Sequence, residues 1–526
     1  MTSTRSASGI GGRIRAARAA TTTVLLLALT AATLARGGDE AHAGSQAQPN
    51  IVVVTTDDQS LSMMRGRYMP ETTRQIGERG ARFTNYVVTT PLCCPSRATL
   101  LTGQYAHNNG VLANHYDLLG DKSNVLPAWL RRAGYRTAHV GKFLNAYEQA
   151  VDDRFEVAPG WDVWFTALGG TRYFDYEISA NGRRRHFGKG PRSHITRVLN
   201  RKAASLIRRF TPSTEPLYLQ LDHRAPHTET GVNSGGRCGA RALPEDPRDE
   251  EGVRDEPLPT PPSFNEADVS DKPSYIHDSA LLNRVRIKGI TKRYRCGLAS
   301  LQSVDRGVKK IVRALRQAGE LGNTVLVFTS DNGFYFGEHR LARGKTHPYE
   351  EGIRVPLLIR VPPRYGAAAG ATLDEPVANI DLAPTLLEVA SADPCAADDD
   401  CRVMDGRSMV PLLRGSERWP NERGVLVEYD GASFKGTSSC EYHGIRAEGW
   451  IYVDHVRIPN PLTGVCEETE ETELYHLTRD PYQLQSIPAD ALSVTTPLRT
   501  RLARLSDCAG IEGRDPVPAE GLSYCE

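Results

Sequence analysis

A cysteine pair followed by proline, serine and arginine is the most chemically distinctive run in this chain of 526 residues. Pro95 lies where a helix can start, Ser96 can cap one, and the residues up to position 103 have helical character. We therefore expect Cys93 just ahead of a helix N-terminus, where backbone N–H groups and the helix dipole favour an anion. Arg97 adds a planar positive group suited to a tetrahedral oxyanion. The run predicts an anion site with sulfur at its base, whereas the cysteine pair alone favours buried structural cysteines or disulfide partners.

Two apolar, β-branched segments are followed directly by oxygen-bearing side chains. Residues 50–56 and 324–330 are typical of strands buried on both faces, as in a parallel sheet. Open α/β sheets bind their ligands at the carboxyl ends of such strands. The side chains found there are Asp57, Asp58, Asp331 and Asn332. Each pair alone fits an ordinary solvated turn, but the two together predict an all-oxygen cation site.

Two further predicted strands end in groups that can bind anions or transfer protons. Residues 134–143 form a strand that stops at Lys142, and residues 216–221 form a buried strand that precedes His223 and His227. A lysine at a strand end is normally solvated, and a lone histidine is more often a packing residue. Neither signal is therefore specific without the other motifs.

Taken together, these motifs resemble the type I sulfatases, the formylglycine-dependent family. The resemblance rests on Cys-x-Pro-Ser-Arg before Leu-Thr-Gly, on Gly-Tyr-x-Thr-x-x-Val-Gly-Lys ending at Lys142, and on a lysine before Tyr-Glu at Lys345. In that family a dedicated enzyme oxidises the first cysteine to formylglycine, an aldehyde. The resemblance therefore implies that Cys93 is converted and that Cys94 is the variable position after it. The implied catalytic and sulfate-binding residues are Cys93, Arg97, Lys142, His227 and Lys345.

One divalent cation follows from the oxygen ligands and from the same resemblance. The expected ligands are Asp57, Asp58, Asp331 and Asn332, joined by an oxygen from Cys93 after its conversion or from sulfate. Hard oxygen ligands suit Ca²⁺ first and Mg²⁺ second. Such a cation would orient the sulfate oxygens and the nucleophile and offset developing charge.

The implied activity is hydrolysis of sulfate monoesters, with a sulfated small molecule or glycan as substrate. The Cys-Cys-Pro-Ser-Arg variant and residues 141–145 look most like the N-acetylglucosamine-6-sulfatase branch. Many relatives carry a histidine two residues after the lysine, where this chain has Leu144 and then Asn145. The role of that histidine is therefore absent or is taken by Asn145. His227 and Lys345 are both candidates for the leaving-group acid.

Two other functions remain open on the residues. One is a phosphomonoester or phosphonate hydrolase on the same fold, because the anion site suits both tetrahedral groups. The other is a non-catalytic protein that binds sulfated glycans. The complete set of nucleophile and metal residues argues against the second, and relative rates on aryl sulfate and aryl phosphate discriminate the first.

Apolar strands interleaved with helices predict an α/β fold with a doubly wound sheet. The resemblance makes this the alkaline-phosphatase-like sulfatase fold: a large, mostly parallel sheet between helices, with a smaller C-terminal antiparallel domain. We expect a catalytic domain over residues 44–415 and a C-terminal α+β subdomain over residues 416–526. Helices are predicted at 125–132, 195–210 and 294–317, and antiparallel strands at 424–429 and 450–456.

The N-terminal segment has the features of an export signal. Arg13, Arg15 and Arg18 form a basic region before an apolar stretch over residues 21–35, and Ala41-His42-Ala43 is a small-x-small cleavage site. We expect a signal peptide over residues 1–43 and a secreted mature protein, with a membrane anchor as the less favoured alternative because the apolar run is short.

The charge balance and the cysteines complete the sequence-based expectations. Lys+Arg is 64 and Asp+Glu is 63, so the net charge of +1 favours neither nucleic acid nor a stable membrane association. Apart from Cys93 and Cys94, eight cysteines remain in an exported chain, which suggests disulfides. Cys395–Cys401 is the best guess, and the others are expected to pair in chain order.

Overall fold

The computed structural model describes residues 48–526 apart from short gaps, and the predicted signal peptide over residues 1–43 lies outside the described residues. The gaps are 171, 212, 230–237, 239–240, 367–368, 398–399, 421, 432–438, 461–462 and 489–490. Residues 48–526 form one unit by their internal contacts. The expected domain boundary at residue 415 stays a prediction.

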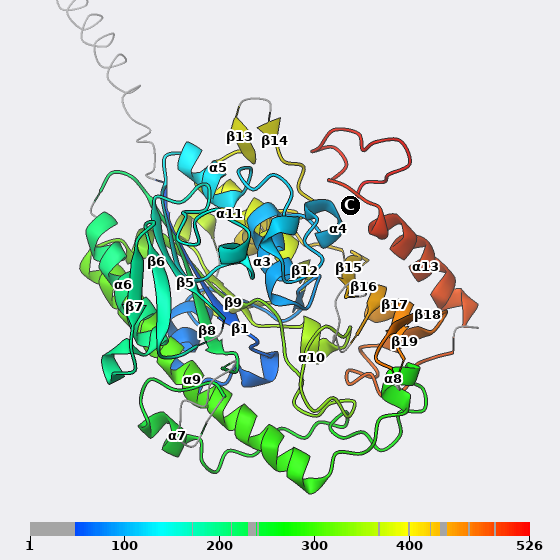
Figure 1. The fold of residues 1–526 in the computed structure, drawn as a ribbon. Helices are drawn as coiled ribbons and strands as arrows, with labels where there is room; N and C mark the ends of the chain where they lie inside the picture. Colours follow the sequence, from blue (N-terminus) through cyan, green and yellow to red (C-terminus); the bar gives the residue numbers. More distant parts are fainter. Residues whose placement is uncertain are drawn as a thin grey trace, which may run out of the picture. The chain divides into compact units, whose positions relative to one another are not determined.

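A ten-stranded mixed sheet forms the centre of this unit (Figure 1). Its strands run in the order β11 (Ala371–Leu373), β2 (Ala81–Phe83), β10 (Leu357–Arg360), β9 (Thr324–Ser330), β1 (Asn50–Asp57), β8 (Leu217–Pro226), β4 (Arg136–Lys142), β5 (Val163–Leu168), β6 (Tyr176–Ala180) and β7 (Arg184–Phe187). The five strands from β9 to β5 are parallel to one another, whereas β10, β6 and β7 join antiparallel. The predicted α/β fold with a large, mostly parallel sheet is confirmed.

Helices cover both faces of the sheet, which explains the uniformly apolar central strands. Val52 and Val54 of β1 pack in one core cluster with residues of α6 (Ile195–Phe210) and α9 (Arg284–Gln317). The alternate residues Ile51 and Val53 pack in a second cluster on the other face. The helices of that second face are α3 (Cys93–Thr102), α5 (Leu126–Arg132) and α11 (Leu382–Ala390). Fully burying one such aliphatic side chain contributes roughly 1.5–3 kcal/mol, so the two clusters hold the strand ends in fixed positions.

The predicted helices are present, with one start placed wrongly. The helix over residues 195–210 is confirmed, and that over 125–132 begins one residue later, at Leu126. The helix expected from residue 294 begins at Arg284 instead, because the Asn283 side chain caps it by accepting the Arg286 N–H. Its first residues are mostly charged and exposed, so apolar periodicity could not reveal this extension.

A second, five-stranded antiparallel sheet lies near the C-terminus (Figure 1). Its strands are β15 (Val425–Asp430), β16 (Glu441–Ala447), β17 (Trp450–Pro459), β18 (Cys466–Glu468) and β19 (Thr472–His476). The predicted strands at 424–429 and 450–456 correspond to β15 and β17. Helix α13 (Leu492–Ser506) packs on this sheet through Leu498, Leu502 and Leu505.

The four disulfides follow the predicted pairing in chain order. They are Cys238–Cys296, Cys395–Cys401, Cys440–Cys466 and Cys508–Cys525. Cys93 and Cys94 are both unpaired and buried, which rules out the alternative that they are disulfide partners. Both thiols are therefore available for a role other than disulfide formation.

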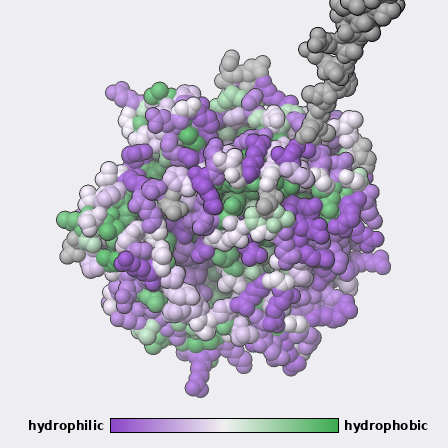
Figure 2. Space-filling model, turned by 180° about the vertical axis from the view of Figure 1, so that it is seen from behind, coloured by the Kyte–Doolittle hydropathy of each residue, from purple (hydrophilic) through white to green (hydrophobic). Residues whose placement is uncertain are grey.

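The face seen in Figure 2 is mostly hydrophilic, with hydrophobic residues in small scattered groups. Within the described residues, no helix is both long enough and apolar enough to cross a bilayer.

Candidate active site

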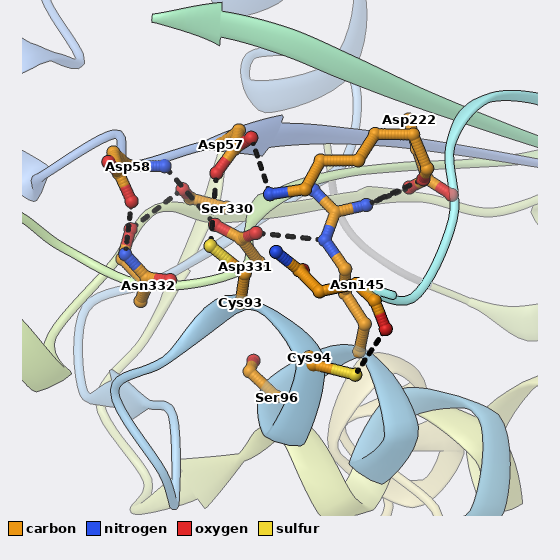
Figure 3. Close-up of polar contacts among 12 residues, drawn as sticks. Asp57, Asp58, Cys93, Cys94, Ser96, Asn145, Asp222, Ser330, Asp331 and Asn332 are labelled. Carbon is orange, nitrogen blue, oxygen red and sulfur yellow. Dashed lines mark hydrogen bonds and ion pairs between the residues drawn. The ribbon is translucent and has the colours of Figure 1, made fainter. Parts of the chain in front are cut away.

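Strand register alone brings the four predicted oxygen ligands together. Thr56 of β1 is paired with Ser330 of β9, so the residues after each strand emerge side by side. The backbone N–H of Asp331 donates to the carbonyl of Thr56 at 3.1 Å, and the Asp58 N–H donates to Oδ1 of Asp331 at 3.2 Å. Asp58 has a φ of 66°, a left-handed turn that an aspartate tolerates better than a bulky residue. The Asn332 amide donates to Oδ1 of Asp58 at 2.7 Å, which closes the cluster (Figure 3).

Cys93 is the first residue of helix α3 rather than the residue ahead of it. The N-cap is Leu92, and no side chain caps the helix. The predicted start at Pro95 with Ser96 as its cap is therefore wrong. Pro95 falls in the first turn, where its missing N–H leaves no helical hydrogen bond unmade, so proline does not mark the start. The Ser96 hydroxyl instead lies 3.1 Å from the donating amide of Asn379.

The sulfur of Cys93 faces the carboxylate cluster. Sγ lies 3.4 Å from Oδ1 of Asp57 and 2.7 Å from Nζ of Lys345. The ligand atoms of Cys93 and of Asp57, Asp58 and Asp331 all lie within 4.8 Å of one another, and all four residues are buried. Burial, and next the charge of Asp57, raise the pKa of the Cys93 thiol to about 12. An unmodified thiol here would therefore be protonated and poorly nucleophilic at neutral pH.

Two lysines from different parts of the chain reach the same cluster. Lys142, the last residue of β4, has Nζ 2.8 Å from Oδ2 of Asp57. Lys345 lies in the segment between β9 and α10 (Glu350–Ile353), and its Nζ is 2.5 Å from Oδ1 of Asp58. Both lysines thus contact carboxylates of the cluster, and their role as sulfate contacts stays a prediction.

Arg97 is also at the cluster, but its contacts are with carboxylates and a carbonyl. Its Nε donates to Oδ2 of Asp331 at 2.9 Å, and Nη1 donates to the Lys142 carbonyl at 3.0 Å and lies 3.5 Å from Oδ1 of Asp222. Nη2 is buried and has no hydrogen-bond partner among the described residues. Two of its three nitrogens are therefore used to hold Asp331 and the end of β4.

Of the two candidate histidines, the structure brings His227 to the site. Nε2 of His227 lies 3.5 Å from Oδ2 of Asp58, and Nδ1 lies 2.6 Å from the carbonyl of Thr228. A carbonyl only accepts, so Nδ1 carries the proton of the neutral ring and Nε2 faces the cluster. His223 is completely buried, and neither of its ring nitrogens has a hydrogen-bond partner within the described residues.

The donor atoms of the cluster fit a divalent cation. Burial opposes ionisation of Asp57, but Lys142, His227, Arg97 and Lys345 outweigh it and hold its pKa well below its usual value. Burial, and next the charge of Asp57, raise the pKa of Asp331. A divalent ion among these carboxylates would favour the ionised form of each, and carboxylate and amide oxygens are ligands that Ca²⁺ and Mg²⁺ accept. The residues present therefore fit such an ion.

Asp222 is a site residue that the sequence motifs left without a role. It lies in β8 and is 1% exposed; Oδ1 faces Arg97 and Oδ2 lies 3.1 Å from Nε2 of His139. An acidic residue near the carboxyl end of a buried parallel strand was the signal used for Asp57 and Asp331 and could have identified it. Asp222 orients Arg97, which in turn orients Asp331.

The residues after Lys142 differ in their surroundings. Leu144 is buried in the core cluster that includes α3 and α5. Asn145 is partly exposed, and its Oδ1 has no hydrogen-bond partner among the described residues. Only Asn145 is therefore placed to replace a polar group at this position.

Comparisons with known proteins agree on one family. The sulfatase family model matches residues 49–392, and a model described as N-sulphoglucosamine sulphohydrolase, C-terminal, matches residues 337–507. Human N-acetylglucosamine-6-sulfatase is 30% identical over 499 residues, covering 89% of this chain and 86% of its own length. A putative extracellular sulfatase Sulf-1 homolog from Caenorhabditis elegans is 33% identical over 377 residues, covering 70% of this chain; the match spans about half (49%) of that longer relative.

Solved structures share the fold at lower identity. BT4656 in complex with its substrate D-glucosamine-2-N,6-O-disulfate superimposes with a TM-score of 0.69 at 23% identity, over 87% of this chain and 97% of the other. The phosphonate monoester hydrolase of Agrobacterium radiobacter has a TM-score of 0.59 at 20% identity, over 86% of this chain and 95% of the other. At these identities the likeness concerns the fold alone, and the fold does not separate sulfate from phosphonate chemistry.

Proposed function

The chain belongs to the sulfatase family, and we propose that it hydrolyses sulfate monoesters with a nucleophile made from Cys93. The observation that carries the proposal is the position of the Cys93 sulfur, 2.7 Å from the amine of Lys345 and 3.4 Å from a carboxylate oxygen of Asp57. A group on the Cβ of residue 93 therefore points at the cluster where cationic side chains and cation ligands meet.

The proposed nucleophile is the hydrated aldehyde of formylglycine. One of its two hydroxyl oxygens attacks the sulfur of the ester in line, the bond from sulfur to the alcohol oxygen breaks, and the alcohol leaves with a proton. The second hydroxyl then loses its proton, the carbon–oxygen double bond re-forms, and the bond from that carbon to the sulfate oxygen breaks. Sulfate is released and the aldehyde is regenerated, whereas a bare thiol would form an adduct that only water could resolve.

The side chains divide the remaining tasks. Lys142 and Lys345 bind the charged sulfate oxygens, and Arg97 positions Asp331 and β4 while its Nη2 is buried without a hydrogen-bond partner among the described residues. The alcohol needs a proton as it leaves, and His227 or Lys345 supplies it. His227 is the better donor on this geometry, because the backbone carbonyl of Thr228 fixes its ring with Nε2 toward the cluster. It donates as the imidazolium, in which Nε2 also carries a proton.

The cation of the proposed site is Ca²⁺, with Mg²⁺ as second choice. Asp57, Asp58, Asp331 and Asn332 would hold it, together with an oxygen from the converted Cys93. When bound, it offsets negative charge on the sulfate oxygens.

Two further proposals concern maturation and export. A separate formylglycine-generating enzyme supplies the oxidation of Cys93 before the buried site closes, because the residue is 1% exposed once folded. The four disulfides support an oxidising compartment, in agreement with a cleaved signal peptide over residues 1–43 and secretion.

The proposed substrate class is sugar sulfates. It is supported by the similarity to human N-acetylglucosamine-6-sulfatase over 89% of this chain and by the sequence motifs of residues 93–97 and 141–145. A panel of 6-sulfated glucosamines and other sulfated sugars would identify the natural ester.

The test compares hydrolysis of 4-nitrophenyl sulfate and 4-nitrophenyl phosphate by protein produced together with a formylglycine-generating enzyme. We expect a higher kcat/KM for the sulfate, complete loss in Cys93→Ala, and retention in the matched control Cys94→Ala. Faster hydrolysis of the phosphate would support the phosphomonoester alternative instead, and binding of sulfated sugars without any turnover would support the non-catalytic one.

A further inference from the structure

A cavity of about 250 Å³ adjoins the proposed sulfate site. Its walls come from residues 142–149, which follow β4, from residues 166–170 around the end of β5, and from Arg224 of β8. Lys142 belongs both to the cavity wall and to the proposed sulfate site. Its Nζ contacts one carboxylate oxygen of Asp57, and the other oxygen of that carboxylate faces Cys93. A substrate with its sulfate at Cys93 would therefore extend past Lys142 into this cavity.

Arg224 brings a buried positive charge to the cavity wall. The residue is 3% exposed, and its guanidinium donates to neutral carbonyls: Nη1 to Arg172 and Nη2 to Leu168, each at 3.3 Å. Its Nε is buried without a hydrogen-bond partner in the described part of the chain. None of the carboxylates in that part forms an ion pair with it, although the charges of Asp57 and Glu148 favour its protonated form. Burial lowers the pKa of Arg224 to about 10, which reflects the cost of holding this charge away from water.

Two neighbouring side chains define what could bind beside Arg224. Asn145 lines the cavity, and its Oδ1 has no hydrogen-bond partner among the described residues. Glu148 also lines it; its carboxylate accepts the backbone N–H of Gly169 at 2.9 Å and acts on Arg224 through its charge without forming an ion pair.

An anion is the ligand that this arrangement lacks. A buried charge without an ion-pair partner is costly, and a neutral hydroxyl would satisfy Nε but would not supply that partner. The reacting sulfate has its own cations in Lys142 and Lys345. We propose that Arg224 binds a second anionic group, a sulfate or a carboxylate, carried on the alcohol part of the substrate. This inference rests on the proposed function and makes the preferred substrate a doubly anionic sugar.

The turnover experiment uses three substrates that share the reacting ester. They are N-acetylglucosamine 6-sulfate, N-sulfoglucosamine 6-sulfate, and a disaccharide in which N-acetylglucosamine 6-sulfate adjoins glucuronate. We expect wild-type protein to favour one of the two doubly anionic substrates, and the one favoured identifies sulfate or carboxylate as the bound group. Arg224→Gln should reduce that preference in kcat/KM at least tenfold, mainly through KM, because a charge-assisted hydrogen bond is lost.

Arg224→Lys and Arg185→Gln are the matched variants. The lysine keeps the charge and should recover part of the preference, whereas Arg185 is exposed on β7 and does not line the cavity, so its loss removes one positive charge without removing a cavity contact. Equal losses on all three substrates in Arg224→Gln would overturn the inference, as would wild-type protein without any preference.

A binding measurement separates this inference from the proposed function. Calorimetry of N-sulfoglucosamine 6-sulfate and of the glucuronate disaccharide, with Cys93→Ala protein in Ca²⁺, needs no turnover. The additional Arg224→Gln change should weaken binding of at least one of them about tenfold more than the additional Arg185→Gln change. That result would stand even if no ester were hydrolysed, and unchanged affinities for both ligands would refute the role of Arg224. Unfolding midpoints, with Arg224→Lys as the conservative variant, identify any general loss of structure.

Discussion

The amine of Lys345 lies 2.7 Å from the sulfur of Cys93, although 252 positions separate the two residues in the sequence. The same amine lies 2.5 Å from Oδ1 of Asp58. Lys345 therefore links the residue that is to become the nucleophile with a predicted metal ligand. A bound sulfate would contact the same amine.

The first prediction concerns this lysine. Lys345→Met should lower kcat for an aryl sulfate by about 10²–10³-fold, because a preorganised positive group no longer meets the developing charge. Steady-state kinetics measure the effect, with Lys309→Met, an exposed lysine of α9, as the control. A change confined to a few-fold in KM would show that Lys345 does not act on the transition state.

The second prediction concerns the cation. Chelation should abolish activity, Ca²⁺ should restore it better than Mg²⁺, and Asp58→Asn should weaken cation binding because one anionic ligand is lost. Elemental analysis together with titration of the chelated protein gives the stoichiometry. Full activity in protein that contains no divalent metal would disprove the site.

The third prediction separates the two candidate proton donors. A sugar alkoxide needs a proton as it leaves, whereas a nitrophenolate needs little help. His227→Ala should therefore lower kcat/KM for a sugar sulfate by about 10²-fold or more and affect 4-nitrophenyl sulfate much less. Lys345→Ala is the comparison, since its sulfate contact is common to both substrates. Equal losses on both substrates in His227→Ala would refute its role as the acid.

The fourth prediction concerns stability and pH. Nδ1 of His107, in α4 (Ala106–Asn109), lies 3.0 Å from Oε2 of Glu428 in β15, so the pair joins the C-terminal sheet to the segment after α3. Burial alone would lower the pKa of His107, but Glu428 outweighs it and raises the pKa to about 9. The histidine is thus protonated in the folded chain at pH values where it is neutral in the unfolded one.

The direction of the pH dependence follows from this raised pKa. The stabilisation is complete below about pH 6.5 and is lost as the pH rises through about 9. Its upper limit is about 3 kcal/mol, from the size of the shift. Unfolding midpoints from pH 6 to 10 should fall more for wild-type protein than for His107→Gln, and parallel curves for the two proteins would exclude the pair as a contributor.

The sequence predicted the parts of this site that depend on strand ends. Buried strands with β-branched residues specify both the parallel pairing and the edge at which Asp57 and Asp331 meet, so the closeness of these two residues follows from the strand pattern itself. The disulfide pairing also followed, because chain-order pairs are local in this fold. Lys345 could be assigned only through its motif, since no periodicity marks a residue in an irregular segment.

Other features depended on contacts that a single sequence does not specify. The start of α3 at Cys93 was missed because proline fits several positions of a first turn. Arg97 was expected to meet an oxyanion, but Asp331 and Asp222 occupy much of its hydrogen-bonding capacity. The sequence could not predict a binding role for Arg224, because that role depends on whether a carboxylate packs beside the guanidinium in the folded chain.

The measurement that tests the central claim most directly is the mass of the peptide that contains residue 93, taken from protein with measured sulfatase activity. The account predicts an aldehyde at residue 93, an unmodified thiol at Cys94, and an aldehyde content that rises in proportion to the specific activity of different preparations. Fully active protein in which residue 93 is an unmodified cysteine would contradict it.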